Sequence, residues 1–180
     1  MDNSLKQLID VLLRGGIAVI RTDTLYGIVA RAEDEQAVER VYRVKGRDTR
    51  KSCILLVSDV SQVYGDQEAF RHDTTIPVGQ PASYLIESPS APHWLLRENQ
   101  SLAYRLPGLD WLRLVISHTG PLIAPSANPE GLPPARTIEQ ARQYFSQWVD
   151  LYVDGGEVSA DTPPSRLVKV KADGSLVRIR

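Results

Sequence analysis

Basic residues gather in one short segment of the sequence, and an anion is the ligand that such a segment favours. Residues 43–51 read RVKGRDTRK, so five of nine positions are basic and one is acidic. Cations this close together repel one another unless an anion lies among them, and phosphate is an anion that Lys and Arg bind well. The segment also follows a predicted helix, where cations complement the helix dipole. The sequence therefore predicts a phosphate site here, with a solvated helix end as the alternative.

Two further segments carry hydroxyl and amide groups. Residues 21–27 read RTDTLYG, and residues 124–131 read APSANPEG. Each by itself is typical of an ordinary polar turn or Asx turn. Arg105 differs from both, because it ends an apolar segment, and a guanidinium in such a place needs a structural carboxylate or a ligand carboxylate as its partner.

Familiar catalytic motifs are missing from the sequence. There is no P-loop, no G-x-G-x-x-G dinucleotide motif and no G-x-S-x-G nucleophile elbow. Cys53 lies within an apolar run, so we expect a small buried hydrophobic residue rather than a nucleophile. The three histidines have no metal-ligand spacing, and a single cysteine excludes a disulfide and a cysteine-rich zinc site. We therefore expect no metal site built from side chains of this chain.

Four amphipathic segments predict the helices that position these loops. They span residues 4–14, 34–45, about 112–116, and 137–148. Asp34 is a suitable N-cap for the second helix, and Gly46 is a suitable residue to end it. The fourth helix begins with the capping box Thr137-x-x-Gln140, and its apolar stripe runs to Trp148. The basic segment is thus expected at the C-terminal end of the second helix.

Short apolar runs bounded by Gly and Pro predict the strands. They span residues 17–20, 53–57, 83–86, 102–106 and 151–153, followed by a hairpin over 167–180 that turns at Asp173-Gly174. The polar segment 64–81 is predicted to be a loop, as are residues 21–27 beyond the first strand. Because helices and strands are interspersed along the chain, the fold class is α/β or α+β with a mixed sheet. No repeat or linker divides the sequence, which predicts one domain over residues 1–180.

Composition and charge exclude several classes of protein. The 180 residues are 42% hydrophobic and 24% charged, which is typical of a soluble globular protein and argues against disorder. No stretch reaches the roughly eighteen apolar residues of a membrane span, and the charged N-terminal segment is not a secretory signal. Lys and Arg number 21 against 22 Asp and Glu, so no global positive field attracts a polyanion. We expect a cytoplasmic protein with a local anion site.

Taken in order, six segments resemble the motifs of the YrdC-like threonylcarbamoyl-AMP synthase family. They are RTDTLYG (21–27), KGRD (45–48), LAYRLP (102–107), APSANPEG (124–131), VDGG (153–156) and TPPSR (162–166). The resemblance extends from about Gly15 to Arg180 and points to the short, single-domain branch of the family. The W-P-G-P-x-T motif of the family appears here as VGQPAS (78–83), and KGRD lacks the family's Pro after Arg47.

The resemblance implies a fold and an activity. The fold is a three-layer twisted mixed sheet around a concave, positively charged cavity. The activity is nucleotidyl transfer: L-threonine, bicarbonate and ATP, with Mg²⁺ as the expected assisting ion, give threonylcarbamoyl-AMP and pyrophosphate. Partner proteins then move the threonylcarbamoyl group to tRNA.

The resemblance also implies which residues form the site. Those expected to face ATP are Lys45, Arg47, Lys51, Ser101, Ser126 and Arg178, with Lys45 and Arg47 as the catalytic cations. Those expected to hold threonine or shape its pocket are Thr22, Thr24, Tyr26, Arg105, Asn128 and Ser165. No protein nucleophile is needed, because the substrate carbamate attacks the α-phosphorus and the protein supplies positioning and charge.

A second function stays open for the same set of motifs. An RNA-binding module of this family would use the cavity rim for tRNA, ribosomal RNA or double-stranded RNA and make no adenylate. The net charge of −1 counts against strong RNA binding by this chain alone. A hydrolase built on Cys53 or a histidine has no supporting group of residues.

Overall fold

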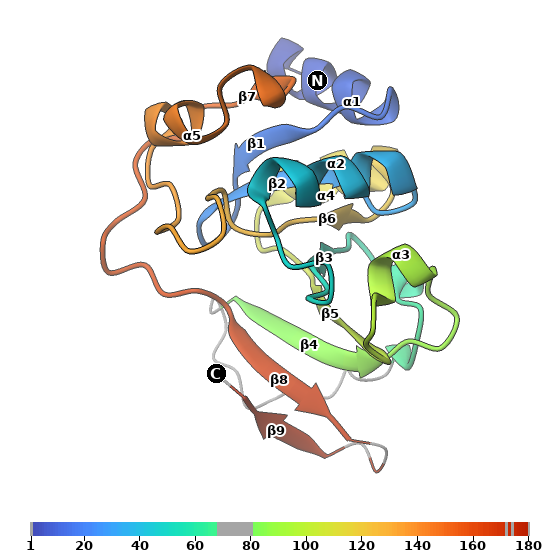
Figure 1. Ribbon diagram of the computed structural model, residues 1–180. Helices are drawn as coiled ribbons and strands as arrows, with labels where there is room; N and C mark the ends of the chain where they lie inside the picture. The colour runs from blue at the N-terminus through green and yellow to red at the C-terminus, as the bar shows by residue number, and fades with distance from the viewer. Residues whose placement is uncertain (1, 68–80, 172, 174, 180) are drawn as a thin grey trace.

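One mixed β-sheet organises the molecule. The computed structural model describes residues 2–67, 81–171, 173 and 175–179. Within these residues nine strands pair in the order β7-β1-β2-β6-β3-β5-β4-β8-β9, as Figure 1 shows. Their bounds are β1 (Ala18–Arg21), β2 (Tyr26–Arg31), β3 (Ile54–Leu56), β4 (Ala82–Glu87), β5 (Ser101–Arg105), β6 (Leu122–Ile123), β7 (Leu151–Tyr152), β8 (Arg166–Val170) and β9 (Leu176–Arg178). The predicted mixed sheet is confirmed.

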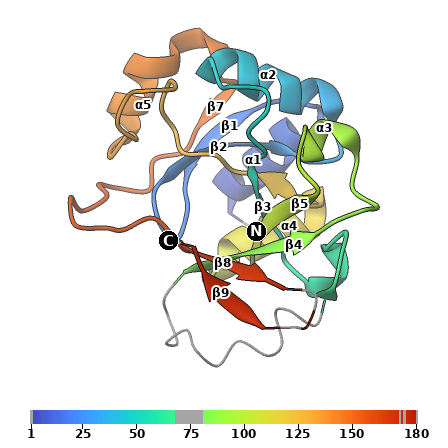
Figure 2. The same cartoon turned by 60° about the horizontal axis from the view of Figure 1, so that its bottom comes forward.

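Helices cover both faces of this sheet (Figures 1 and 2). They are α1 (Asn3–Leu13), α2 (Glu35–Lys45), α3 (His93–Leu96), α4 (Asp110–Thr119) and α5 (Ile138–Phe145), with 3-10 turns at Val60–Gln62 and Ser146–Trp148. One buried cluster joins α1 and α4 to Ile20 and Val29, whereas the other joins α2, α3 and α5 to Val19 and Ile28. Because neighbouring residues of a strand point to opposite faces, these clusters lie on the two sides of the sheet. The three layers predicted from the resemblance follow.

Local sequence features set the ends of α2 and the start of α5 as predicted. The Asp34 carboxylate accepts the Ala37 N–H at 3.0 Å, and Gly46 ends α2 in the left-handed region with φ 60°. The Thr137 hydroxyl accepts the Gln140 N–H at 3.2 Å, so α5 begins at the predicted cap. The return bond of the capping box is displaced by one residue, since Gln140 accepts the N–H of Arg136.

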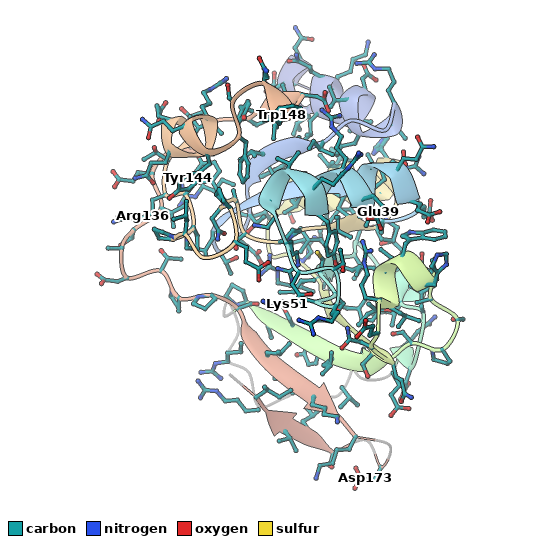
Figure 3. The ribbon with its side chains drawn as sticks, viewed as in Figure 1. Glu39, Lys51, Arg136, Tyr144, Trp148 and Asp173 are labelled. Atoms are coloured by element: carbon teal, nitrogen blue, oxygen red, sulfur yellow. The ribbon has the colours of Figure 1, made fainter. Side chains whose placement is uncertain are left out.

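Two local predictions were wrong, and two strands were not predicted. Tyr26 and Gly27, predicted to lie in the loop 21–27, begin β2; the rest of this strand was not predicted, because both of its faces are buried and the sequence lacks the alternation that marks a half-exposed strand. Residues 122–123 form the short strand β6, which was not predicted either. Trp148 does not continue the α5 stripe: the helix ends at Phe145, the chain turns at Ser146 with φ 46°, and Trp148 is 62% exposed (Figure 3).

Parts of the remaining predictions lie outside the described residues. This applies to 68–80, which make up most of the predicted loop 64–81 and include the first three residues of VGQPAS. The arms of the C-terminal hairpin are confirmed, because β8 pairs with β9 in antiparallel register from Val168↔Arg178 to Val170↔Leu176. Among the described residues, no helix has the length and apolar character that crossing a bilayer requires.

The short strand β6 joins two parts of the sheet. It pairs with β2 through Ala30↔Ile123 and Arg31↔Leu122, and with β3 through Leu55↔Ile123 and Leu56↔Leu122. The β1–β2 hairpin lies on one side of this strand, and β3, β5, β4 and β8 lie on the other. The loop after β6 continues between them, since Ala124 N–H donates to Ile54 and Ile28 N–H donates to Pro125. The predicted site loops therefore meet around β6.

Candidate functional site

A cavity of about 730 Å³ lies where these two parts of the sheet meet. Its walls come from the turn after β1, the loop before β3, the end of β5, the loop after β6 and residues 159–165 between β7 and β8. The predicted site residues that line it are Thr22, Thr24, Tyr26, Arg47, Arg105, Ser126 and Ser165. This volume is in the usual range for small-molecule sites, which is about 300–1,000 Å³. The fold thus brings seven of the twelve predicted residues to one hollow.

Arg105 is buried at the end of β5 and is held by the turn after β1. Its Nη1 donates to Thr24 Oγ1 at 3.2 Å, and its Nη2 donates to Thr22 Oγ1 at 3.5 Å. Asp23 Oδ1 lies 3.4 Å from Nη2, so the structural carboxylate that the sequence predicted as one alternative is Asp23. Burial lowers the pKa of the Arg105 guanidinium, and the Asp23 charge opposes that shift.

This group retains unused hydrogen-bonding capacity. Among the described residues, Arg105 Nε and Asp23 Oδ1 are buried and have no hydrogen-bond partner. The Thr22 hydroxyl donates to the Leu25 carbonyl at 2.8 Å, so Thr24 must donate in the 3.1 Å contact between the two hydroxyls. Thr24 then has one lone pair occupied by Arg105 and a second one for a ligand N–H. The geometry suits a ligand that carries both a carboxylate and an amine.

Two of the predicted cations bind the protein itself. Lys45 is 3% exposed, and its amine donates to the carbonyl oxygens of Ser126 and Asn128. Burial, together with the charge of Arg47, lowers the Lys45 pKa to about 8. Lys51, in the loop before β3 (labelled in Figure 3), forms an ion pair with Glu130. Neither lysine lines the cavity. Lys45 fixes the loop after β6 to the end of α2, and Lys51 fixes it to the loop before β3.

Arg47 is the cation of this segment that reaches the cavity wall. Its Nη2 donates to the Ser52 carbonyl at 2.8 Å, and its Nε lies 3.3 Å from the Lys51 carbonyl. These bonds orient the guanidinium at the cavity wall. Cys53 lines the cavity beside it, and burial raises the pKa of the thiol. The expectation of a buried cysteine is confirmed by its 4% exposure.

The predicted loop residues play different parts. The Ser126 hydroxyl lines the cavity and donates to Asn128 Oδ1 at 2.6 Å, whereas the Asn128 amide donates to Pro129 and Leu132 carbonyls and holds the loop. The Tyr26 ring lines the cavity, and its hydroxyl accepts Gly155 N–H and donates to the Gly156 carbonyl. Tyr26 therefore fixes the start of residues 153–165, which we call the connecting segment.

The last three predicted residues differ in whether they reach the cavity: Ser165 lines it, Arg178 lines a neighbouring hollow, and Ser101 lines neither. The Ser165 hydroxyl lies 2.9 Å from that of Ser83. Arg178 pairs with Val168, so it points to the opposite face of the sheet from Leu167, the β8 residue that lines the cavity. Arg178 instead lines an adjacent hollow of about 500 Å³, which shares Thr24 and Ser165 with the first. Ser101 lies at the far end of β5 from Arg105 and does not line either hollow.

Arg136 is a cavity residue that sequence reasoning missed. It lies between α5 and the connecting segment (Figure 3), where its Nε donates to the Val158 carbonyl at 3.0 Å and its Nη2 lies 3.4 Å from Glu157. No local pattern predicts this, because the cavity forms only when residues 153–165 fold back beside the loop after β6. Among the described residues, no group of three His, Cys, Asp or Glu side chains could hold a metal ion.

Comparisons with known proteins agree with this arrangement of sequence and fold. The Sua5/YciO/YrdC family model, which carries the description telomere recombination, matches residues 10–180. The threonylcarbamoyl-AMP synthase of Pseudomonas fluorescens (strain Pf0-1) is 31% identical over 169 residues, which cover 91% of this chain and 90% of that protein. The threonylcarbamoyl-AMP synthase of Hahella chejuensis is 28% identical over 180 residues, which cover 97% of each.

Solved structures with the same fold were also found. E. coli YciO superposes with a TM-score of 0.81 at 22% identity, over 98% of this chain and 88% of that one. P. abyssi Sua5 in complex with L-threonine superposes with a TM-score of 0.85 at 23% identity, over 98% of this chain. The present chain spans about half of that Sua5 chain, 53% of its length. At these identities the superpositions establish the fold.

Proposed function

Because the chain belongs to the Sua5/YciO/YrdC family, we propose that it is a threonylcarbamoyl-AMP synthase. It combines L-threonine, bicarbonate and ATP and releases pyrophosphate. The observation that carries this proposal is that Arg105 and Arg47 line one cavity, and that Arg105 Nε has no hydrogen-bond partner among the described residues.

The Arg105 end of the cavity suits an amino acid. A guanidinium binds a carboxylate through two parallel hydrogen bonds, and the free lone pair of Thr24 accepts a hydrogen bond from the amine. Ser165 also lines the cavity, where its hydroxyl is 2.9 Å from that of Ser83. These groups are assigned to threonine in this proposal, together with Thr22, which orients Arg105.

The opposite end suits the nucleotide. Arg47 and Ser126 line it, so we assign them to the phosphates of ATP. Lys45 acts through Ser126 and Asn128, whose carbonyls it binds, and is thus a positioning residue. Ser101 and Lys51 are left out of the assignment because they do not line the cavity. Arg178, in the adjacent hollow, is retained for an extended phosphate chain.

The proposed chemistry needs charge and positioning rather than a nucleophile from the protein. The threonine amine and bicarbonate give a carbamate with loss of water. A carbamate oxygen then forms a bond to the α-phosphorus while the bond to the pyrophosphate oxygen breaks. Arg47 stabilises the charge that develops on the leaving group. Mg²⁺ is proposed as an ion carried by the phosphates, since this ion usually keeps several waters and few protein ligands.

A threonine-dependent pyrophosphate assay tests the proposal. The purified protein is incubated with ATP, bicarbonate and L-threonine, and each substrate is omitted in turn. Release that requires all three, with the adenylate detected by mass spectrometry, is the expected result. Release without threonine, or none at all, would contradict the proposal. Salt-sensitive RNA binding without pyrophosphate release would instead favour the RNA-binding module.

The cellular role belongs to the same proposal. The adenylate is a mixed anhydride that hydrolyses, so a transfer protein and tRNA must consume it soon after release. The proposed site of action is the cytoplasm, where these partners and ATP are found together.

A further inference from the structure

Arg97 occupies a backbone position that normally takes glycine. Asn99 N–H donates to the Leu96 carbonyl at 2.9 Å, which closes a four-residue turn, and Arg97 has φ 60° and ψ −123°. These are the angles of the first central position of a type II′ turn, where glycine predominates. Among the described residues, Ser146 is the one other non-glycine residue with positive φ. Such strain persists where the surrounding structure requires the side chain.

The Arg97 side chain packs against α2 and is only 11% exposed. Its guanidinium carbon lies 3.9 Å from the centroid of the Tyr42 ring, and its Nη1 lies 2.7 Å from Glu39 Oε1 on the same helix. The Nε and Nη2 atoms are buried without a hydrogen-bond partner among the described residues. Arg97 therefore carries two unfavourable features, backbone strain and unmade hydrogen bonds, which stacking on Tyr42 and the Glu39 ion pair offset.

Tyr42 transmits this contact to the loop before β3. Its hydroxyl donates to the Lys51 carbonyl at 2.7 Å and accepts from the Cys53 thiol at 3.3 Å. Arg47 lies on the same ring, with its guanidinium carbon 5.8 Å from the centroid. From the same turn as Arg97, the Asn99 amide donates to the Arg50 carbonyl at 2.9 Å. The side of residues 46–53 that faces away from the cavity is thus held by Tyr42 and by the 96–99 turn.

We infer that Arg97 and Tyr42 are positioning residues that fix residues 46–53, and thereby set how well Arg47 meets the phosphate groups of the nucleotide. The part that concerns ATP rests on the proposed function. The part that concerns the loop does not, because it follows from contacts that hold Lys51 and Cys53 whatever the ligand.

The Cys53 thiol reports directly on this loop. It is the single cysteine of the chain; it lines the cavity but is only 4% exposed, and its thiol donates to the Tyr42 hydroxyl. We therefore expect a thiol reagent to label it slowly until residues 46–53 open. Tyr42→Phe removes the hydroxyl bonds to Lys51 and to the Cys53 thiol itself. Arg97→Gly removes the guanidinium, relieves the backbone strain and does not touch the thiol, so it is the variant that decides. We expect each variant to raise the labelling rate about tenfold, which corresponds to about 1.4 kcal/mol in the opening equilibrium. Labelling rates equal to those of the native protein would overturn the inference.

Two control variants separate this effect from general changes in stability. Ser146→Gly relieves the same kind of strain away from the cavity. Arg142→Ala removes from α5 a guanidinium that stacks on the Tyr152 ring of β7. Both should label Cys53 at the native rate. Faster labelling in the controls to the same extent would also overturn the inference, because it would indicate global unfolding.

Steady-state kinetics tests the nucleotide part. Arg97→Gly and Tyr42→Phe should raise the KM for ATP about tenfold and leave the KM for threonine unchanged, since Arg105 is held by Thr22, Thr24 and Asp23 and not by residues 46–53. Equal increases in both KM values would argue against a positioning role. If the native protein releases no pyrophosphate, the proposed function fails, and the labelling rates alone decide whether the loop is held as inferred.

Discussion

Two groups of charges, one in the cavity and one beside it, have different partners. In the cavity, Arg105 and Asp23 are buried together and each retains an atom without a hydrogen bond among the described residues. Beside the cavity, Lys45 and Lys51 are bound to carbonyl oxygens and to Glu130 of the protein. In the proposed function the first group binds the ligand, whereas the two lysines hold segments of the protein together.

This difference predicts which charges act in ligand binding and which act in stability. Removing the charge of Arg105 should weaken ligand binding, and it should also lower stability because the buried Asp23 carboxylate loses its partner. Removing Lys45 or Lys51 should lower stability and affect binding only through the loops. A basic segment in a sequence therefore does not by itself locate the ligand, because carbonyl oxygens of the same chain satisfy much of its charge.

Arg105→Ala gives the largest expected effect and tests the first half of the comparison. The KM for threonine should rise between about 30-fold and several thousand-fold, because loss of a buried charged partner costs about 2–5 kcal/mol. Arg113→Ala, which removes an exposed guanidinium of α4, is the matched control. The measurement is threonine-dependent pyrophosphate release. An unchanged threonine KM in a folded variant would remove Arg105 from the site.

Lys45→Met tests the second half. Two carbonyl oxygens lose a charged donor, so the free energy of unfolding should fall by about 2 kcal/mol, or about 4–8 °C in Tm. Thermal and urea unfolding measure this change. A variant as stable as the native protein would mean that Lys45 does not hold the loop after β6.

The pH dependence of stability sharpens the same point. The Lys45 pKa is about 8 in the folded protein against 10.5 for an ordinary lysine. Between these values the unfolded chain binds a proton that the folded protein has released, so stability rises with pH, by up to about 3 kcal/mol. Below pH 8 this contribution is constant. Urea unfolding from pH 7 to 10.5 should show the rise in the native protein and not in Lys45→Met, and parallel profiles would contradict it.

Glu130→Gln should have the smallest effect. Glu130 pairs with Lys51 near the surface, where solvent screens the interaction. We expect Tm to change by less than about 3 °C. A larger decrease, seen also in Lys51→Met and not additive in the double variant, would show that this pair holds the loops as firmly as Lys45 does.

Local sequence patterns predict those elements whose ends carry their own chemistry. Asp34, Gly46 and Thr137 each fix a helix end through backbone groups a few residues away, so their roles are visible in the sequence. β2 was missed because a strand buried on both faces has no alternation. Trp148 was misplaced because the helix ends at a strained turn that the apolar stripe does not reveal.

For the site, the sequence predicted the residues that belong to recognisable motifs and no others. The resemblance brought Thr24, Arg47, Arg105 and Ser126 to attention, and all four line the cavity. It could not separate them from Lys45, because the partner of a cation depends on which carbonyl groups the fold places beside it. Arg97 and Arg136 were missed for a related reason, since their contacts join segments distant in sequence.

The two-residue strand β6 has a consequence for the sheet as a whole. Thr22 and Thr24 belong to the β1–β2 side of this narrow joint, and Arg105 belongs to the β3–β5 side. Their hydrogen bonds join the two sides of the sheet that are otherwise connected through β6, a strand of only two residues. A molecule lodged among these three side chains would act as a crosslink between the two sides. Occupancy of the hollow and stiffness of the nine-stranded sheet should therefore increase together.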